Sequence, residues 1–335
     1  MRAVRLHKIG EQFQVEQVPD PSSPPGGAVV RLETAALNHR DEYIRVGLYA
    51  RIQLPAILGS DGAGLVESVA PGVDQSWIGR KVVISPFDDW GPNPRAQDPK
   101  TFFIRGMPRQ GTFAEKIALP LDRLEPLPEH LSWPEAAALP LAGLTAYRAL
   151  VTRGQLQKGE HVLVTGIGGG VATVAMLLAQ ALGAEVSVTS GSEEKLQRAR
   201  SMGAVAAVSY KEKGWEKQLA EKAGRPPSLI VDSAGGPDFA ALVNGVAPGG
   251  RIVSYGATRG PVEKLEMTRV FFKQIDVLGS TMGTDEEFRA MLRLVARERV
   301  RPIVDHVFPL SQAAEADRRL AQSEQMGKIV LNRRA

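Results

Sequence analysis

The sequence of 335 residues contains no cysteine. This absence excludes disulfide bonds, a thiol nucleophile and every zinc site that depends on thiolate ligands. Apolar runs long enough to cross a membrane are also missing, and residues 1–6 alternate like a strand rather than a secretory signal. We therefore expect a cytoplasmic protein with no membrane partner.

Neither sign of charge dominates the sequence. The 41 Lys and Arg residues and 37 Asp and Glu residues leave a net charge of only +4, and the two signs are interspersed. This pattern predicts no nucleic-acid partner. The five histidines are scattered, so they suggest no Ser–His–carboxylate triad. The length allows about two domains.

A glycine-rich turn is the most informative feature that is present. An apolar run at residues 161–164 leads directly into it, and a helical pattern follows. One glycine permits a sharp turn, another lets backbone N–H groups approach phosphates, and a small residue brings helix and strand together. The helix N-terminus adds partial positive charge. The residues predicted to bind a dinucleotide here are Gly168, Gly169, Gly170, Val171 and Ala172.

Strand-like and helix-like segments alternate after this turn. Strands are predicted at residues 185–190, 204–210, 229–233 and 251–256, and a helix at 192–202 with Ser192 as its N-cap. Such alternation indicates βαβ units and a parallel sheet. We predict an α/β fold in which residues 126–282 form a doubly wound, Rossmann dinucleotide-binding domain.

The end of the second predicted strand indicates which dinucleotide binds. An acidic residue there would accept hydrogen bonds from the ribose of NAD and repel the 2′-phosphate of NADP. This chain has Ser190 and Ser192 instead, with Lys195 one helical turn later. These residues predict NADP(H). The alternative is that Ser192 only caps the helix and Lys195 is a solvated surface residue.

The remaining segments indicate a mainly β, barrel-like domain. Residues 1–125 consist of short alternating runs separated by Pro and Gly clusters. Thr284 and Glu287 form a predicted capping box for a helix through residue 299. A strand near 304–308, a helix at 311–325 and a strand at 328–331 then follow. We expect residues 283–335 to return to the first domain.

Many short motifs follow one another in the order found in a known family. They are Leu37-Asn38-His39-Arg40-Asp41, Gly47-Leu48-Tyr49, Leu58-Gly59-Ser60-Asp61-Gly62, Gly111-Thr112-Phe113-Ala114-Glu115, Leu144-Thr145-Ala146-Tyr147 and Gly327-Lys328-Ile329-Val330-Leu331. With these motifs the chain resembles the medium-chain dehydrogenase/reductase superfamily, and is most similar to its zinc-free quinone-oxidoreductase-like branch. The resemblance implies a GroES-like catalytic domain and a homodimer formed through the cofactor domains. It also implies cofactor contacts from Tyr210, from Tyr255 and Gly256, and from the region of Gly279 and Ser280. Thr145 is a further residue predicted to bind the cofactor.

The resemblance also locates the positions that hold zinc in the alcohol dehydrogenases of this superfamily. These positions are Asn38, Ser60 and Leu141 or Ala142 here, a set that does not make a soft tetrahedral site. The segment that matches the structural-zinc lobe, residues 88–110, contains no cysteine. Asp41, Asp61, Asp88, Asp89 and His39 are candidates for a harder site, but such residues in loops are mostly solvated or capping. We predict no metal.

Hydride transfer without a metal requires an acceptor that is already electron-poor, such as a quinone or an α,β-unsaturated carbonyl compound. The protein then has to position the acceptor, donate hydrogen bonds to its oxygen and exclude water. The candidate catalytic donors are Asn38, Arg40, Tyr43 and Ser60, and Thr145 is a further candidate donor.

Each of these candidates also has a structural alternative. Asn38 can hold backbone or cofactor, and Arg40 can pair with Asp41. Tyr43 can line the edge of the core, and Ser60 can simply line a pocket. The sequence therefore predicts an NADPH-dependent reductase of quinones or α,β-unsaturated carbonyls. The alternatives are a metal-free alcohol or aldehyde dehydrogenase and a non-catalytic NADPH-binding protein.

Overall fold

The computed structural model describes residues 1–333 and divides the chain into two compact units. The first consists of Met1–Ala142 together with the segment from Gly283 onward, and the second is Gly143–Met282. The break near residue 283 lies where the sequence pattern changes. Residues 126–142 differ from the prediction, because they lie in the first unit. There α2 (Trp133–Ala137) packs on strands β3 and β5, and Thr34 Oγ1 donates to the Trp133 carbonyl at 2.7 Å.

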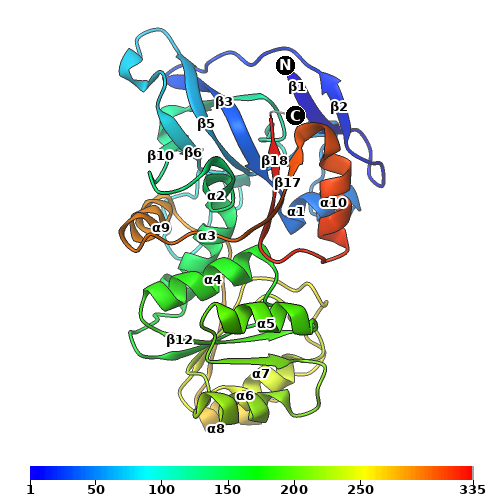
Figure 1. The fold of residues 1–335 in the computed structure, drawn as a ribbon, viewed down its shortest axis with the longest axis vertical. Helices are drawn as coiled ribbons and strands as arrows, with labels where there is room; N and C mark the ends of the chain where they lie inside the picture. Colours follow the sequence, from blue (N-terminus) through cyan, green and yellow to red (C-terminus); the bar gives the residue numbers. More distant parts are fainter. Residues whose placement is uncertain (334–335) are drawn as a thin grey trace. The chain divides into compact units, whose positions relative to one another are not determined.

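The main sheet of the first unit is built around strand β3 (Gly27–Ala36). It runs in the order β10-β6-β5-β3-β18-β17, and β9 also pairs with β3. Figure 1 shows the C-terminal strand β18 between β3 and β17. The other bounds are β5 (Asp61–Val69), β6 (Lys81–Ile84), β9 (Lys116–Pro120), β10 (Leu124–Pro126), β17 (Val304–Pro309) and β18 (Lys328–Asn332).

Smaller strands and helices complete the first unit. A second sheet runs in the order β2-β1-β4, and β7 pairs with β8. Short 3-10 turns lie at Gln75–Trp77, Leu121–Arg123 and Leu310–Gln312. The strands are β1 (Arg2–Leu6), β2 (Gln14–Gln17), β4 (Ala56–Ile57), β7 (Phe87–Asp88) and β8 (Phe103–Ile104), and the helices are α1 (His39–Arg45), α9 (Asp285–Arg297) and α10 (Ala313–Ala321).

The core of the first unit explains why its last segment returns to it. Leu37 and Phe113 are buried together with Leu320 and Leu331 in one apolar cluster. Val330 pairs with Ala36 across the β18–β3 ladder. The predicted capping box is present at α9, where Thr284 Oγ1 accepts from Glu287 N at 3.2 Å and Glu287 Oε2 accepts from Thr284 N at 2.7 Å. Burial of apolar residues from both ends of the chain thus holds the unit together.

The second unit contains the predicted doubly wound parallel sheet. Its strand order is β13-β12-β11-β14-β15-β16, with all neighbours parallel. The strands are β11 (His161–Val164), β12 (Glu185–Ser190), β13 (Ala206–Ser209), β14 (Leu229–Asp232), β15 (Arg251–Ser254) and β16 (Asp276–Gly279). The helices are α4 (Gly170–Ala181), α5 (Glu193–Ser201), α6 (Trp215–Ala223), α7 (Phe239–Gly245) and α8 (Met267–Lys273).

Two elements differ from the sequence analysis. Strand β16 was not predicted, because it lies at an edge of the sheet and most of its residues are exposed. The second is the π-helical turn at Arg148–Arg153, which continues α3 (Pro140–Tyr147). Both departures depend on tertiary packing rather than on local periodicity.

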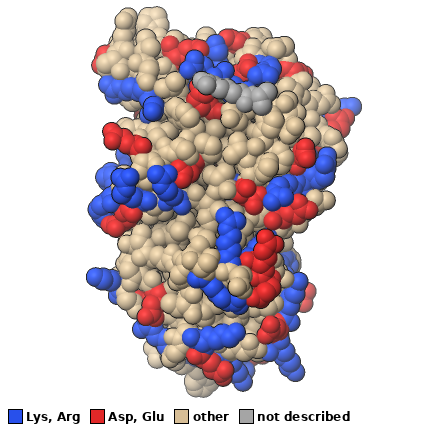
Figure 2. Space-filling model, viewed as in Figure 1, with Lys and Arg blue, Asp and Glu red and all other residues tan. Residues whose placement is uncertain are grey.

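The surface carries charges of both signs. Figure 2 shows Lys and Arg interspersed with Asp and Glu over the face in view. Within residues 1–333, no helix is both long enough and apolar enough to traverse a lipid bilayer.

Candidate functional site

The glycine-rich turn connects β11 to α4 in the second unit. Gly166 and Gly168 have φ values of 66° and 129°, in the region that favours glycine. Gly169 is the N-cap of α4, and Ile167 N donates to the Thr189 carbonyl at 2.7 Å, which ties the turn to β12. The turn therefore ends at a helix N-terminus, as a pyrophosphate-binding loop requires.

The Lys195 side chain lies against the glycine-rich turn at Gly168. A Cβ atom at Gly168 would lie 2.8 Å from Lys195 Cδ and 3.1 Å from Lys195 Nζ. The Lys195 side chain thus lies along the turn, and the structure brings together two regions that the sequence analysis selected separately. Backbone N–H groups and an ammonium at one place suit a phosphate.

The end of β12 carries further polar groups. Ser190 Oγ accepts from Ser192 N at 3.2 Å, and Ser192 Oγ accepts from Lys195 N at 3.4 Å. Ser192 is therefore the N-cap of α5, which was one of its alternative roles. A Cβ atom at Gly191 would lie 2.6 Å from the Tyr210 hydroxyl and 2.9 Å from Lys211 Cε. Tyr210 and Lys211 thus contact the region between the two serines.

Positive charge gathers around this strand end. The Arg259 guanidinium lies 5.3 Å from the centre of the Tyr210 ring, within the range of a cation–π contact. Glu193, on the first turn of α5, is paired with Arg200 at 2.6 Å. Hydroxyls, lysines and an arginine thus lie together at the end of β12, where Arg259 also pairs with Asp238.

Asp232 organises the neighbouring strand ends and was missed by the sequence analysis. It is 1% exposed, accepts from Thr165 Oγ1 at 2.7 Å and accepts from Gly235 N at 3.0 Å. Tyr255 N donates to the Asp232 carbonyl at 2.9 Å, and burial raises the pKa of the Tyr255 phenol. Asp232 thus joins the ends of β11, β14 and β15.

The remaining positions predicted to bind the cofactor also lie in this unit. Gly256 approaches backbone closely, since a Cβ atom there would lie 3.0 Å from the Ser233 carbonyl oxygen. Thr145 is 5% exposed, and its Oγ1 lies 4.0 Å from Met282 Sδ. Gly256 and Thr145 thus both lie at close-packed positions of the second unit.

A buried polar cluster occupies the first unit around Asn38. Lys328 is 3% exposed, and its Nζ donates to Leu37 O at 2.6 Å, Asn38 Oδ1 at 2.5 Å and Asp61 Oδ2 at 2.9 Å. Asn38 Nδ2 also donates to Asp61 Oδ2, at 2.9 Å, and Leu141 N donates to Asp61 Oδ1 at 2.8 Å. All three ammonium donors and both carboxylate oxygens of this ion pair have partners.

These residues do not fit a catalytic zinc ion. The Asn38 amide is fixed between Lys328 and Asp61, so its oxygen already accepts from an ammonium. Ser60 is a neutral hydroxyl, and Leu141 has no donor on its side chain. Among the described residues, no group of three or more His, Asp or Glu side chains is arranged to hold a metal. The donor set is unsuitable for zinc.

Arg40 lies beside this cluster, on α1. Its Nη1 donates to Ser60 Oγ at 3.1 Å and to the Arg105 carbonyl at 2.8 Å. Ser60 Oγ donates to the same Arg105 carbonyl at 2.8 Å. The single hydroxyl hydrogen of Ser60 is therefore engaged within the protein in this structure. Its role in this geometry is to orient Arg40.

Burial changes the pKa of two further side chains on α1, those of Asp41 and Tyr43. Asp41 accepts from Asn38 N at 2.9 Å and from Gly59 N at 3.3 Å, and lies 3.8 Å from Arg40 Nη1. Burial raises the pKa of the Asp41 carboxyl, against the opposing effect of Arg40. Tyr43 is half-buried, and burial raises the pKa of its phenol. Tyr43 therefore remains a protonated hydroxyl at neutral pH.

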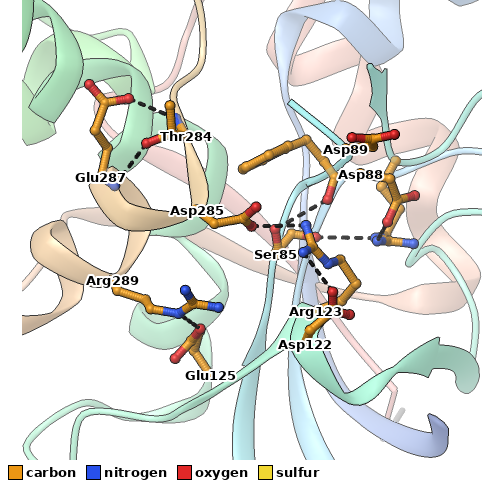
Figure 3. Close-up of polar contacts among 12 residues, drawn as sticks. Ser85, Asp88, Asp89, Asp122, Arg123, Glu125, Thr284, Asp285, Glu287 and Arg289 are labelled. Carbon is orange, nitrogen blue, oxygen red and sulfur yellow. Dashed lines mark hydrogen bonds and ion pairs between the residues drawn. The ribbon is translucent and has the colours of Figure 1, made fainter. Parts of the chain in front are cut away.

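A cavity of about 620 Å³ lies elsewhere in the first unit, under the loop that replaces the structural-zinc lobe. The charged groups around it pair with one another, as Figure 3 shows. Arg123 contacts Asp122 at 2.9 Å and Asp285 at 2.8 Å, and Arg289 contacts Glu125 at 2.6 Å. These ion pairs fasten α9 to the β domain, so we interpret this network as structural.

Comparisons with known proteins agree with this architecture. Residues 24–129 match the alcohol dehydrogenase GroES-like domain family, and residues 170–297 match the zinc-binding dehydrogenase family. The chain is 36% identical to the zinc-type alcohol dehydrogenase-like protein YogA of Leptosphaeria maculans, over 95% of this chain and 94% of that protein. The chain belongs to the medium-chain dehydrogenase/reductase superfamily.

Other members of the superfamily extend the comparison. The quinone oxidoreductase of Pseudomonas aeruginosa is 31% identical over 92% of both chains. A solved NAD-dependent alcohol dehydrogenase is 38% identical, with a TM-score of 0.93 and 99% of both chains covered. This medium-chain dehydrogenase/reductase is thus an oxidoreductase that uses a nicotinamide dinucleotide, and the predicted fold is confirmed.

Lys328, Asp61 and Asp232 are the site residues whose roles the sequence did not reveal. One signal was present for Lys328, because a lysine at the start of an otherwise apolar strand is costly to bury unless it is paired. Its partners lie 290 and 267 positions away in the sequence. The pairing itself was therefore not predictable from local pattern.

Proposed function

We propose that this protein is an NADPH-dependent oxidoreductase that reduces quinones or α,β-unsaturated carbonyl compounds without a metal. The observation that carries the proposal is the cluster at Asn38. There Asn38, at one of the positions that hold zinc in the alcohol dehydrogenases of the superfamily, is fixed by the buried pair of Lys328 and Asp61. Without a Lewis acid, a simple ketone is a poor acceptor, whereas an enone or quinone delocalises the incoming charge.

The second unit supplies the binding of the cofactor. The N–H groups of the turn at Gly168 and Gly169 receive the pyrophosphate, and Lys195 adds a positive charge beside them. Ser190, Tyr210 and Lys211 receive the 2′-phosphate at the end of β12. Bound NADPH supplies the hydride.

The first unit supplies hydrogen bonds to the acceptor. Arg40 and Tyr43 are the donors we assign to the acceptor oxygen, because the Ser60 hydrogen is used internally. Asn38 serves chiefly to fix the surrounding backbone. Charge developing on the acceptor oxygen is then stabilised by a guanidinium that Ser60 and Arg105 hold in place.

We further propose that two copies associate through the cofactor-binding units. Met267, Phe271 and Phe272 on α8 are 58%, 60% and 76% exposed, and Val277 on β16 is 42% exposed. Strand β16 also presents an unpaired sheet edge beside this apolar surface. An apolar patch at a free sheet edge favours association with a second copy.

An assay of NADPH oxidation with a panel of quinones, enals and enones tests the function. We expect turnover in the presence of a chelator and no gain on adding zinc. Turnover only after zinc addition would overturn the metal-free mechanism. Oxidation of simple alcohols with NADP⁺ would support the alcohol dehydrogenase instead, and tight NADPH binding without reduction of any acceptor would support a non-catalytic role.

A further inference from the structure

Arg40 carries an unused hydrogen-bonding edge. The residue is only 7% exposed, and its Nη1 makes the contacts to Ser60 and Arg105. Nε and Nη2 are both buried, and neither has a hydrogen-bond partner among the described residues. Nε and Nη2 lie side by side on one edge of the planar guanidinium and point their N–H groups in nearly the same direction.

The surroundings hold this edge in a fixed orientation. Ser60 and the Arg105 carbonyl fix the opposite side of the guanidinium, and the Tyr49 ring lies 5.1 Å from its centre. Ser60 is itself fixed by its bond to Arg105. Buried donors of a charged group are costly to leave unpaired. An edge that is built in this way and left without a protein partner therefore points to a ligand.

The nearby carboxylates are engaged elsewhere. Asp61 is paired with Lys328 at 2.9 Å. Asp41 accepts from Asn38 N and Gly59 N and approaches Arg40 only at Nη1, at 3.8 Å. No acidic side chain of the described residues thus meets the Nε–Nη2 edge. Asp41 balances the positive charge of Arg40 from the Nη1 side only.

The geometry favours one chemical class of ligand. Two parallel N–H groups match the two oxygens of a carboxylate, in the bidentate contact that arginine makes best. A neutral carbonyl would use only one of them. A phosphate would present further oxygens that this enclosed edge leaves without donors.

We propose that the acceptor reduced by this protein carries a carboxylate, and that the Nε–Nη2 edge of Arg40 binds it. The proposal rests on the reductase function stated above and narrows its substrate class to unsaturated carbonyl acids. For such a substrate Arg40 binds the carboxylate instead of the carbonyl oxygen, and Tyr43 is the donor to the carbonyl oxygen.

A matched pair of acceptors tests this proposal. The anion of 4-oxopent-2-enoic acid and its methyl ester share the same enone and differ in the carboxylate. We expect kcat/KM for the acid to exceed that for the ester by at least about tenfold, because a charge-assisted bidentate contact is worth ten- to a hundredfold. The variant R40K keeps the charge but lacks the paired N–H edge. We expect it to lower the acid-to-ester ratio by about tenfold, mainly through KM for the acid.

A control variant and a binding measurement complete the design. R297K changes an arginine that is 69% exposed and should leave the ratio as it is. Calorimetric titration of levulinate, an unreactive carboxylate probe, into the NADP⁺-loaded protein should give at least about tenfold weaker binding for R40K. Circular dichroism checks that the variants are folded.

Each outcome has a distinct meaning. If neither acid nor ester is reduced, the reductase function fails, while the levulinate titration still tests the edge. The carboxylate proposal is overturned if wild-type protein does not bind levulinate, if R40K binds it equally well, or if acid and ester are reduced with equal efficiency. A crystal structure with only a water on Nε and Nη2 after a levulinate soak would overturn it too.

Discussion

Removing the Lys328 ammonium should destabilise the first unit strongly. The ion pair between Lys328 and Asp61 is enclosed, with side chains 3% and 0% exposed. The substitution Lys328→Met keeps the apolar stem and deletes the charged end. It leaves Asp61 as a buried carboxylate without its counter-charge, and it leaves Leu37 O and Asn38 Oδ1 without their donor.

The size of the expected loss of stability follows from the burial of this ion pair. Breaking a buried ion pair by removing one partner costs about 3–5 kcal/mol, because the other charge remains desolvated. Asp61→Asn alone should cost a similar amount. In the double variant no unpaired charge remains, so its loss of stability should fall short of the sum of the single losses by about 2–3 kcal/mol.

Urea unfolding, followed by far-UV circular dichroism, measures the four proteins of this cycle. Lys116→Met is the matched control, because Lys116 pairs with Asp20 and Glu67 at the surface and such pairs are worth about 0–1 kcal/mol. A loss below about 1 kcal/mol for Lys328→Met would refute the reasoning. So would additivity of the two single losses to within about 0.5 kcal/mol.

Three further predictions concern the cofactor, pH and assembly. Ser190→Asp should weaken NADPH binding about ten- to a hundredfold relative to NADH in fluorescence titrations, and equal affinity of the wild type for both cofactors would contradict the phosphate pocket. Burial and the neighbouring Glu42 carboxylate raise the pKa of Asp317 to about 7, against the opposing effect of Arg45, whose Nε lies 2.6 Å from Asp317 Oδ2. The folded protein therefore keeps the Asp317 proton to a higher pH than the unfolded chain, in which the pKa is about 4. The free energy of unfolding of the wild type should fall as the pH rises from about 4 to about 7, by at most about 4 kcal/mol. Asp317→Asn should raise the free energy of unfolding by about 1–3 kcal/mol at about pH 8 and by less at about pH 5, and a pH-independent gain would be inconsistent with this account. Phe272→Asp should shift the sedimentation of the protein from dimer to monomer, and an unchanged coefficient would place the contact elsewhere.

The sequence predicted the cofactor-binding unit well because its signals are local. The turn at Gly168 and the N-cap Ser192 each depend on residues within a few positions of one another, as does the capping box at Thr284 in the first unit. Parallel strands that are buried on both faces also read as apolar runs. Strand β16 lacks that pattern because it is exposed.

The contacts within the polar cluster of the first unit could not be predicted from local sequence patterns. Asn38, Arg40 and Ser60 were found as candidates, but their partners could not be named. Whether a buried lysine is paired depends on a strand that lies hundreds of residues away, and Arg105 joins the site through a backbone carbonyl that carries no sequence signal. Residues 126–142 were placed in the wrong unit for a related reason, because a helix pattern does not state which sheet the helix covers.

The position of β18 has a consequence for biosynthesis. This strand supplies the ammonium of the buried cluster and lies between two other strands, although it comes at the far end of the chain. During translation the nascent polypeptide can finish the nucleotide-binding unit while the first sheet still has an open gap. Closure of that gap must therefore await synthesis of β18, and a chain truncated before residue 328 would lack the lysine of a constellation whose other members, Leu37, Asn38 and Asp61, are made much earlier.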